Sequence, residues 1–98
     1  MARRIVWTTF ARKSRKDIFL YWDNRNKSKT YSKKLNFLFQ EAVKVVSKFP
    51  QMSEASNNED VRLKIVSHFE LIYHISENQI TVIDIWDTRQ NPENFPVK

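Results

Sequence analysis

The segment of residues 60–76, DVRLKIVSHFELIYHIS, places two runs of β-forming side chains around a two-residue connection. Residues 61–66 and 69–75 are rich in Val, Ile, Leu, Phe and Tyr and alternate with polar positions, which predicts two strands. Because only Ser67 and His68 join them, the two strands should be antiparallel neighbours. The fold must therefore accommodate a tight β-hairpin.

Two more strands are indicated outside this hairpin. Residues 80–86 predict a third strand of the same sheet, and Asn78 in the short connection before them can take positive φ without glycine. Residues 4–9, RIVWTT, are β-branched and aromatic, which predicts a strand at the start of the chain. Thr8 or Thr9 is then in position to cap a following helix.

Two helices are expected between the first strand and the hairpin. Apolar side chains recur at helical spacing over residues 10–25 and again over residues 30–49, after which Pro50 ends the pattern. The apolar stripe of the second helix consists of Tyr31, Leu35, Leu38, Ala42, Val45, Val46 and Phe49. A short polar break joins the helices, so they should form an antiparallel hairpin.

The resulting order is β-α-α-β-β-β. It predicts an α+β fold in which the helical hairpin packs on one face of a small, mainly antiparallel sheet. The 98 residues suffice for one hydrophobic core, so residues 1–98 are expected to form a single domain. Residues 51–59 should form a polar loop without a pattern, and the tail from residue 87, which contains two prolines, should be irregular.

The chain contains neither cysteine nor glycine. Without cysteine it can have no disulfide, thiolate nucleophile or zinc–thiolate site. Without glycine it cannot form the phosphate-binding loops of Walker or Rossmann type. No apolar run is long enough for a membrane span, and the start shows no signal-peptide pattern. We therefore expect a cytoplasmic protein without a cofactor, a metal or a membrane partner.

Charge is distributed unevenly along the chain. Residues 1–50 carry thirteen Lys and Arg against three Asp and Glu, whereas residues 51–98 carry four against eight, and the formal net charge is +6. Such an asymmetry indicates an anionic partner for the first half, either a nucleic acid, an acidic protein or a membrane surface. Long basic side chains that merely solvate two helices would produce the same composition.

The strand of residues 61–66 raises the question of which face carries its cations. If Val61, Leu63 and Ile65 point toward the helices, Arg62 and Lys64 must point away from them. At positions i and i+2, two cations are ~7 Å apart, which suits contacts with successive phosphates. The alternative is an ordinary solvated sheet face, on which Glu70 of the next strand pairs with one of them.

The chain resembles the RelE/ParE superfamily of bacterial toxins over nearly its whole length. IVWTTFARKSRKDIFLYW is similar to the family's first strand, which carries Trp-Thr or Trp-Ser and runs into a helix that contains Ala. The basic, aromatic second helix that ends in Phe49-Pro50 also fits. VRLKIVSHFELIYHI resembles the Arg-containing strand, the turn and the strand that ends in Tyr, and IDIWDTRQNP resembles the last strand and its exit.

This resemblance implies the toxin of a type II toxin–antitoxin system, a class linked to growth inhibition and plasmid stabilization. An acidic antitoxin segment would wrap around such a toxin and neutralise it. RelE-type members cut ribosome-bound mRNA without a metal, through a cluster of cations and an acid or base. ParE-type members inhibit DNA gyrase and lack most of that cluster.

For a RelE-type ribonuclease, the matching positions are Arg62 and Lys64 on the second strand of the family pattern, together with Arg89. Glu70 or Asp87 is then the possible base. Glu70 occupies the position at which these nucleases have Arg, and Asp87 the position at which they have Tyr or His. Cleavage by the 2′-OH needs a base, an acid and cations around the phosphorane. Because the set is incomplete, a gyrase-type or other non-nucleolytic toxin is favoured.

Other residues complete the hypotheses. His68 and His74 are of the residue type most often used as an acid or base, but their positions in a turn and on an apolar strand favour structural roles. For a non-nuclease, the binding residues are expected on the first helix, at Arg12, Arg15 and Lys16. A plain nucleic-acid-binding module whose charge lies on the helices is the third alternative.

Overall fold

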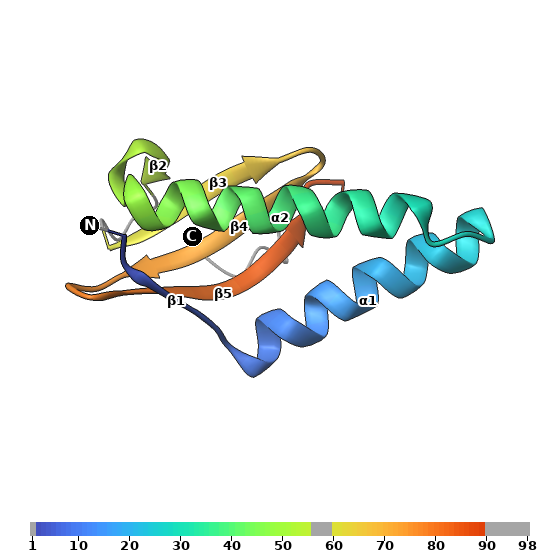
Figure 1. The fold of residues 1–98 in the computed structure, drawn as a ribbon, viewed down its shortest axis with the longest axis horizontal. Helices are drawn as coiled ribbons and strands as arrows, with labels where there is room; N and C mark the ends of the chain where they lie inside the picture. Colours follow the sequence, from blue (N-terminus) through green and yellow to red (C-terminus); the bar gives the residue numbers. More distant parts are fainter. Residues whose placement is uncertain (1, 56–59, 90–98) are drawn as a thin grey trace.

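A computed structural model of the chain describes residues 2–55 and 60–89 (Figure 1). The helical and strand elements are β1 (Arg4–Trp7), α1 (Thr9–Asn26), α2 (Thr30–Lys48), the 3₁₀ turn η1 (Pro50–Met52), β2 (Glu54–Ala55), β3 (Val61–Val66), β4 (Phe69–Ile75) and β5 (Gln79–Asp87). The predicted order and the α+β class are confirmed.

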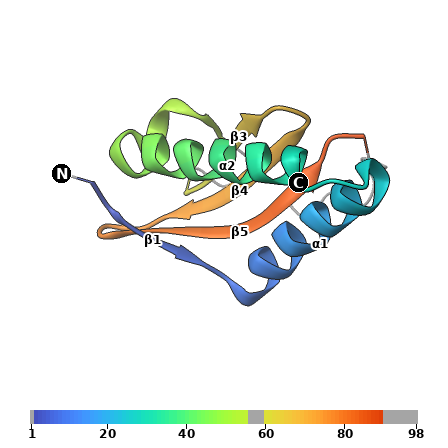
Figure 2. The same cartoon turned by 45° about the vertical axis from the view of Figure 1, so that its right-hand side comes forward.

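The described strands form one five-stranded sheet in the order β1-β5-β4-β3-β2. β1 pairs with β5 in parallel, and the other neighbours are antiparallel. Figure 2 shows α2 running along the sheet over β4 and β3, with α1 beside β5. The helical hairpin therefore covers one face of the sheet, as predicted.

The start of α1 follows directly from its sequence. Thr8 is the N-cap residue, and its hydroxyl accepts a hydrogen bond from the backbone N–H of Ala11 at 3.0 Å. The same hydroxyl donates to the carbonyl of Ile83 on β5 at 3.1 Å, so the cap also attaches the helix to the sheet. At the other end, Lys27 takes a left-handed conformation with φ 53° and closes the last turn onto Asp23.

The segment after α2 has more structure than the pattern-free loop predicted for residues 51–59. Pro50 ends α2 as expected and begins η1, in keeping with the preference of proline for the first position of a helical turn. Glu54 and Ala55 pair with Leu63 and Arg62 as the edge strand β2. Residues 56–59 and the predicted irregular tail from residue 90 lie outside the described residues.

The core lies between α2 and the odd-numbered side chains of β4. Phe69, Leu71 and Tyr73 are fully buried and belong to one cluster with Leu35 and Phe39 of α2. The ring of Phe39 meets that of Phe69 edge to face, with centroids 5.6 Å apart. These contacts identify the helix-covered face of the sheet.

The predicted orientation of β3 is wrong. Arg62 lies directly opposite Tyr73 and Lys64 opposite Leu71, and directly paired residues project to the same face. Both cations are therefore on the helix side. The three apolar side chains on the other side of β3 are those expected to face the helices, Val61, Leu63 and Ile65.

The reason is the position of β3 near the outer edge of the sheet, where only the short β2 follows it. Long basic side chains can bury their aliphatic stems there and still bring their polar ends past the helix. Arg62 and Lys64 are accordingly half-buried, whereas Ile65 on the other face is 65% exposed.

Candidate functional site

Arg62 holds the segment that follows α2. Its Nη1 donates to the carbonyl of Gln51 at 3.2 Å and to that of Ser53 at 3.0 Å. From the neighbouring strand, the hydroxyl of Tyr73 donates to the carbonyl of Pro50 at 2.6 Å. Together the two side chains bind three carbonyls of residues 50–53, so Arg62 acts as a structural clamp in this structure.

Burial raises the pKa of Tyr73, and hydrogen bonding with Ser53 and the nearby charge of Arg62 oppose that shift without reversing it. The hydroxyl therefore remains protonated at neutral pH and serves as a donor to Pro50. The side chain of Tyr73 is fully buried and belongs to the hydrophobic core.

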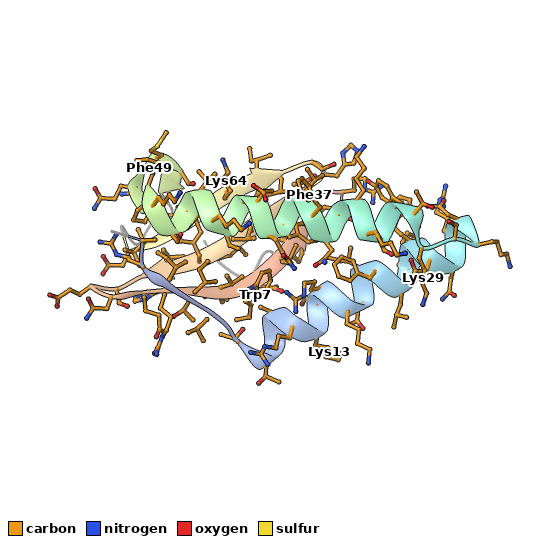
Figure 3. All side chains as sticks on the ribbon, viewed as in Figure 1. Trp7, Lys13, Lys29, Phe37, Phe49 and Lys64 are labelled. Carbon is orange, nitrogen blue, oxygen red and sulfur yellow. The ribbon has the colours of Figure 1, made fainter. Side chains whose placement is uncertain are left out.

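Lys64 occupies a different environment from Arg62. From β3 it lines a hollow together with Val45, Phe49, Met52 and Ile65. In Figure 3 Lys64 lies along α2 between the labelled positions of Phe49 and Phe37. No ion pair among the residues that the structure describes includes Lys64.

Arg89 and Asp87 form a bidentate ion pair at the end of β5. Nη2 of Arg89 lies 2.9 Å from Oδ2 of Asp87, and Nε lies 3.1 Å from Oδ1. Burial by itself would raise the pKa of Asp87, but the hydrogen bonds and charge of Arg89 outweigh it and hold that pKa below its usual range. The guanidinium of Arg89 also lies 5.3 Å from the ring centroid of Trp22 on α1.

The three predicted catalytic cations do not gather around one point. In the register of the sheet, Asp87 of β5 lies opposite Phe69 of β4, and Phe69 lies opposite Val66 of β3. Val66 is four residues along β3 from Arg62. Four residues of strand span ~13 Å, and two inter-strand spacings span ~10 Å. The side chains also diverge, because Arg62 reaches η1 whereas Arg89 reaches α1. A single phosphate cannot contact all three in this arrangement.

The predicted bases are separated from the β3 cations as well. Glu70 lies opposite Ile65 and Trp86, on the sheet face away from the helices, so it cannot pair with Arg62 or Lys64 as expected. Asp87 is engaged by Arg89. His74 shares the face of Glu70, and His68 is exposed in the turn between β3 and β4.

The cations predicted for binding lie together on α1. Arg15 and Lys16 lie three and four residues after Arg12, which places all three on one side of the helix. The guanidinium of Arg15 lies 4.3 Å from the ring centroid of Trp7 on β1, so α1 and the edge strand share this surface. The pKa of Arg15 is lowered, mainly by its partial burial and to a smaller extent by the nearby charge of Arg12. Arg12 and Lys16 are exposed.

An open groove, not predicted from the sequence, lies between α1 and the C-terminal half of β5. β1 pairs only with residues 79–82, so no β1 residue covers the later part of β5, and the groove there has a volume of about 670 Å³. Its lining includes Phe10, Ile18, Tyr21, Trp22, Trp86 and the aspartates Asp17, Asp84 and Asp87. The feature of the sequence that could have indicated this groove is the presence of aromatic residues on a strongly charged helix.

The residues that the structure describes include no group of three His, Asp or Glu side chains able to hold a metal ion. Within the same residues, no helix is long and apolar enough to cross a membrane.

Comparisons with known proteins agree with this fold. A family model described as the ParE toxin of type II toxin-antitoxin system, parDE, matches residues 5–92. A solved structure of the chromosomal ParDE TA system from P. aeruginosa is similar with a TM-score of 0.73 and 15% sequence identity, over 90% of this chain and 98% of that chain. A search of curated proteins found no match.

Proposed function

The chain belongs to the ParE family of toxins from type II toxin–antitoxin systems, and from this premise we propose that it arrests bacterial growth by inhibiting DNA gyrase without cleaving RNA. An antitoxin is its partner in such a system, and we further propose that the antitoxin is acidic, in keeping with the net charge of +6.

The observation that carries the non-nucleolytic mechanism is the dispersal of the candidate catalytic residues. RNA cleavage requires a base near the 2′-OH and cations around the same phosphate. Here Arg62 is committed to the carbonyls of Gln51 and Ser53, and Arg89 is committed to Asp87. Lys64 is the remaining member of the set, and Glu70 is on the other face of the sheet.

We assign target binding to the cationic side of α1, formed by Arg12, Arg15 and Lys16. Two of these side chains are exposed, and the third lies over Trp7, so the surface combines charge with an aromatic ring. Such a surface suits an acidic protein partner, because complementary charge accelerates association and selects the partner.

The test is inducible expression in bacteria, with two assays run side by side. A gyrase supercoiling assay with purified protein should show inhibition, and primer extension on cellular messages should show no new cleavage sites. Message cleavage without gyrase inhibition would support the ribosome-dependent interferase instead. Normal growth would favour a plain binding module.

Variants of the helical hairpin test the assigned surface. The double variant Arg12→Glu/Lys16→Glu should lose growth arrest and gyrase inhibition. The matched control is Lys33→Glu/Lys34→Glu, which makes the same charge change at exposed positions of α2. Equal loss in both double variants would show that overall charge, and not the surface on α1, governs toxicity.

A further inference from the structure

The connection between the two helices forms an exposed and positively charged surface. Residues 24–30, NRNKSKT, include Arg25, Lys27 and Lys29, and all seven residues are exposed. The next acidic residue along the chain is Glu41. Among the residues that the structure describes, no ion pair includes any of the three cations. We call residues 24–30 the hairpin tip.

Hydrogen bonds hold the hairpin tip in one conformation. Lys27 is left-handed, and its backbone N–H and that of Ser28 both donate to the carbonyl of Asp23. The hydroxyl oxygens of Ser28 and Thr30 lie 2.9 Å apart, and Oγ of Ser28 accepts from the backbone N–H of Thr30 at 3.2 Å. The hydroxyl of Ser32 donates to the carboxylate of Asp23, which joins the two helix ends. A ligand therefore meets a preformed backbone, so less entropy is lost on binding.

The stability of α2 does not explain Lys29. This residue is the N-cap of α2, where Ser, Thr, Asp or Asn would accept a hydrogen bond from the first turn. Lys29 makes no such bond, the first turn contains no acidic residue, and a cation at this end opposes the helix dipole. Arg25, by contrast, lies in the last turn of α1, where a cation is favourable. A residue that breaks the local preference in this way is expected where a surface has a function.

The composition of the hairpin tip selects among anionic partners. The segment contains no apolar or aromatic side chain. Protein interfaces have an apolar core, and segments that lie in a membrane surface combine cations with apolar side chains. Single-stranded nucleic acids stack their bases on aromatic rings. Phosphates of a duplex need only cations and hydroxyl or amide donors, all of which the tip provides.

The shape of the molecule favours DNA over RNA. In Figure 1 the connection between α1 and α2 projects beyond the ends of the strands. Figure 3 labels Lys29 at this end of the hairpin. A projecting turn can enter the major groove of B-DNA, which is ~12 Å wide and admits a helix. The major groove of duplex RNA is too deep and narrow for side chains to enter.

We infer that the hairpin tip binds duplex DNA, with Arg25, Lys27 and Lys29 contacting phosphates that border the major groove. Binding through phosphates carries no sequence preference and concentrates the protein on DNA. The inference goes beyond the proposed function and does not depend on it, because gyrase inhibition is assigned to the cationic side of α1.

Fluorescence anisotropy of the full chain with a labelled DNA duplex of about 20 base pairs measures this contact, at salt concentrations from about 50 to 200 mM. The variant Lys27→Asn/Lys29→Gln removes two cations, and Asn tolerates the left-handed conformation of position 27. It should bind about 10-fold to 100-fold more weakly at about 0.1 M salt. The slope of log affinity against log salt should decrease by about 1 for each phosphate contact removed.

The matched control is Lys44→Gln/Lys48→Gln, which makes the same charge change at exposed positions toward the other end of α2. It should change the affinity by no more than about threefold, because those charges are screened from DNA bound at the tip. Circular dichroism melts would verify that both double variants are folded.

Equal losses in the two double variants, or an unchanged affinity and slope in the tip variant, would overturn the hairpin tip as the site. Absence of wild-type binding at the lowest salt concentration would do the same. Tighter binding of the wild type to duplex RNA or to a single strand of the same length would overturn DNA as the ligand. If the wild type binds DNA through the tip but does not inhibit gyrase, only the proposed function is wrong.

Discussion

The two helices are nearly equal in length and both are basic, yet they contribute very differently to the structure. Seven residues of α2 are buried, whereas in α1 only Ala11 is. α2 thus provides most of the helical part of the core. α1 is attached mainly through its partly buried side chains, which leaves more of its surface available for a partner.

The attachments of α1 are mostly aromatic. Phe19 stacks on Phe39 with ring centroids 6.2 Å apart, and Trp22 meets Tyr31 edge to face at 4.8 Å. Arg89 lies over the same indole from the end of β5. The difference between the helices suggests that stability and recognition are divided between them, and four predictions test that division.

The largest effect is expected at Phe39. Phe39→Ala removes a fully buried ring from the core and should lower the free energy of unfolding by about 3–5 kcal/mol. Phe19→Ala, at its half-buried stacking partner on α1, should cost roughly half as much. Urea denaturation followed by circular dichroism measures both values. Equal losses would mean that α1 is as much a part of the core as α2.

The next effect is expected at the clamp on η1. Arg62→Met leaves the carbonyls of Gln51 and Ser53 without this donor and should cost about 1–3 kcal/mol. Arg12→Met at an exposed position of α1 is the control and should change stability by less than about 0.5 kcal/mol. Chemical denaturation of the two variants provides the comparison. No difference between them would contradict the clamp.

A smaller effect on stability is expected from charge reversal on α1. Arg12→Glu/Lys16→Glu should shift the free energy of unfolding by no more than about 0.5 kcal/mol per residue, because both side chains are exposed. The same variant is expected to lose gyrase inhibition. A melt that shows substantial unfolding would mean that its loss of toxicity reports on folding and not on recognition.

The smallest effect concerns the ion pair at the end of β5. The pKa of Asp87 is lower in the folded chain than its ordinary value of 3.8, so its contribution is present above that value and is lost as the pH falls through the folded pKa. The wild type should therefore lose slightly more stability than Asp87→Asn between pH 5 and about pH 3. Parallel slopes in acid denaturation would contradict this assignment.

Most of the architecture could be predicted from the sequence because its signals are local. The cap could be narrowed to Thr8 or Thr9, of which Thr8 is the one observed, and Pro50 could be identified as a stop, from residue type and position alone. The tight turn at Ser67 and His68 marked the hairpin, although Ser67 adopts φ 57° without being glycine. β2 was missed because two residues carry too short a pattern to identify a strand.

The orientation of β3 could have been predicted from its partner. A two-residue connection sets Val66 opposite Phe69, and counting back then places Arg62 opposite Tyr73. β4 has the more continuous apolar face, so it determines which side meets the helices. Alternation within β3 alone was misleading, because its apolar residues include the exposed Ile65.

The candidate site was harder to predict from the sequence than the fold. Residue type identified Arg62, Lys64 and Arg89 as cations, but their roles depend on which groups lie beside each of them. Arg62 meets backbone carbonyls, and Arg89 meets a carboxylate two residues away. Family membership does not depend on those roles, because the family model matches along residues 5–92.

The parallel pairing of β1 with β5 joins the beginning of the sheet to its last strand. During translation, β1 is synthesised long before Gln79–Asp87, so the sheet cannot be completed until most of the chain has been made. The pairing of β1 with β5 therefore completes the sheet at a late stage, after nearly all of its strands have been synthesised.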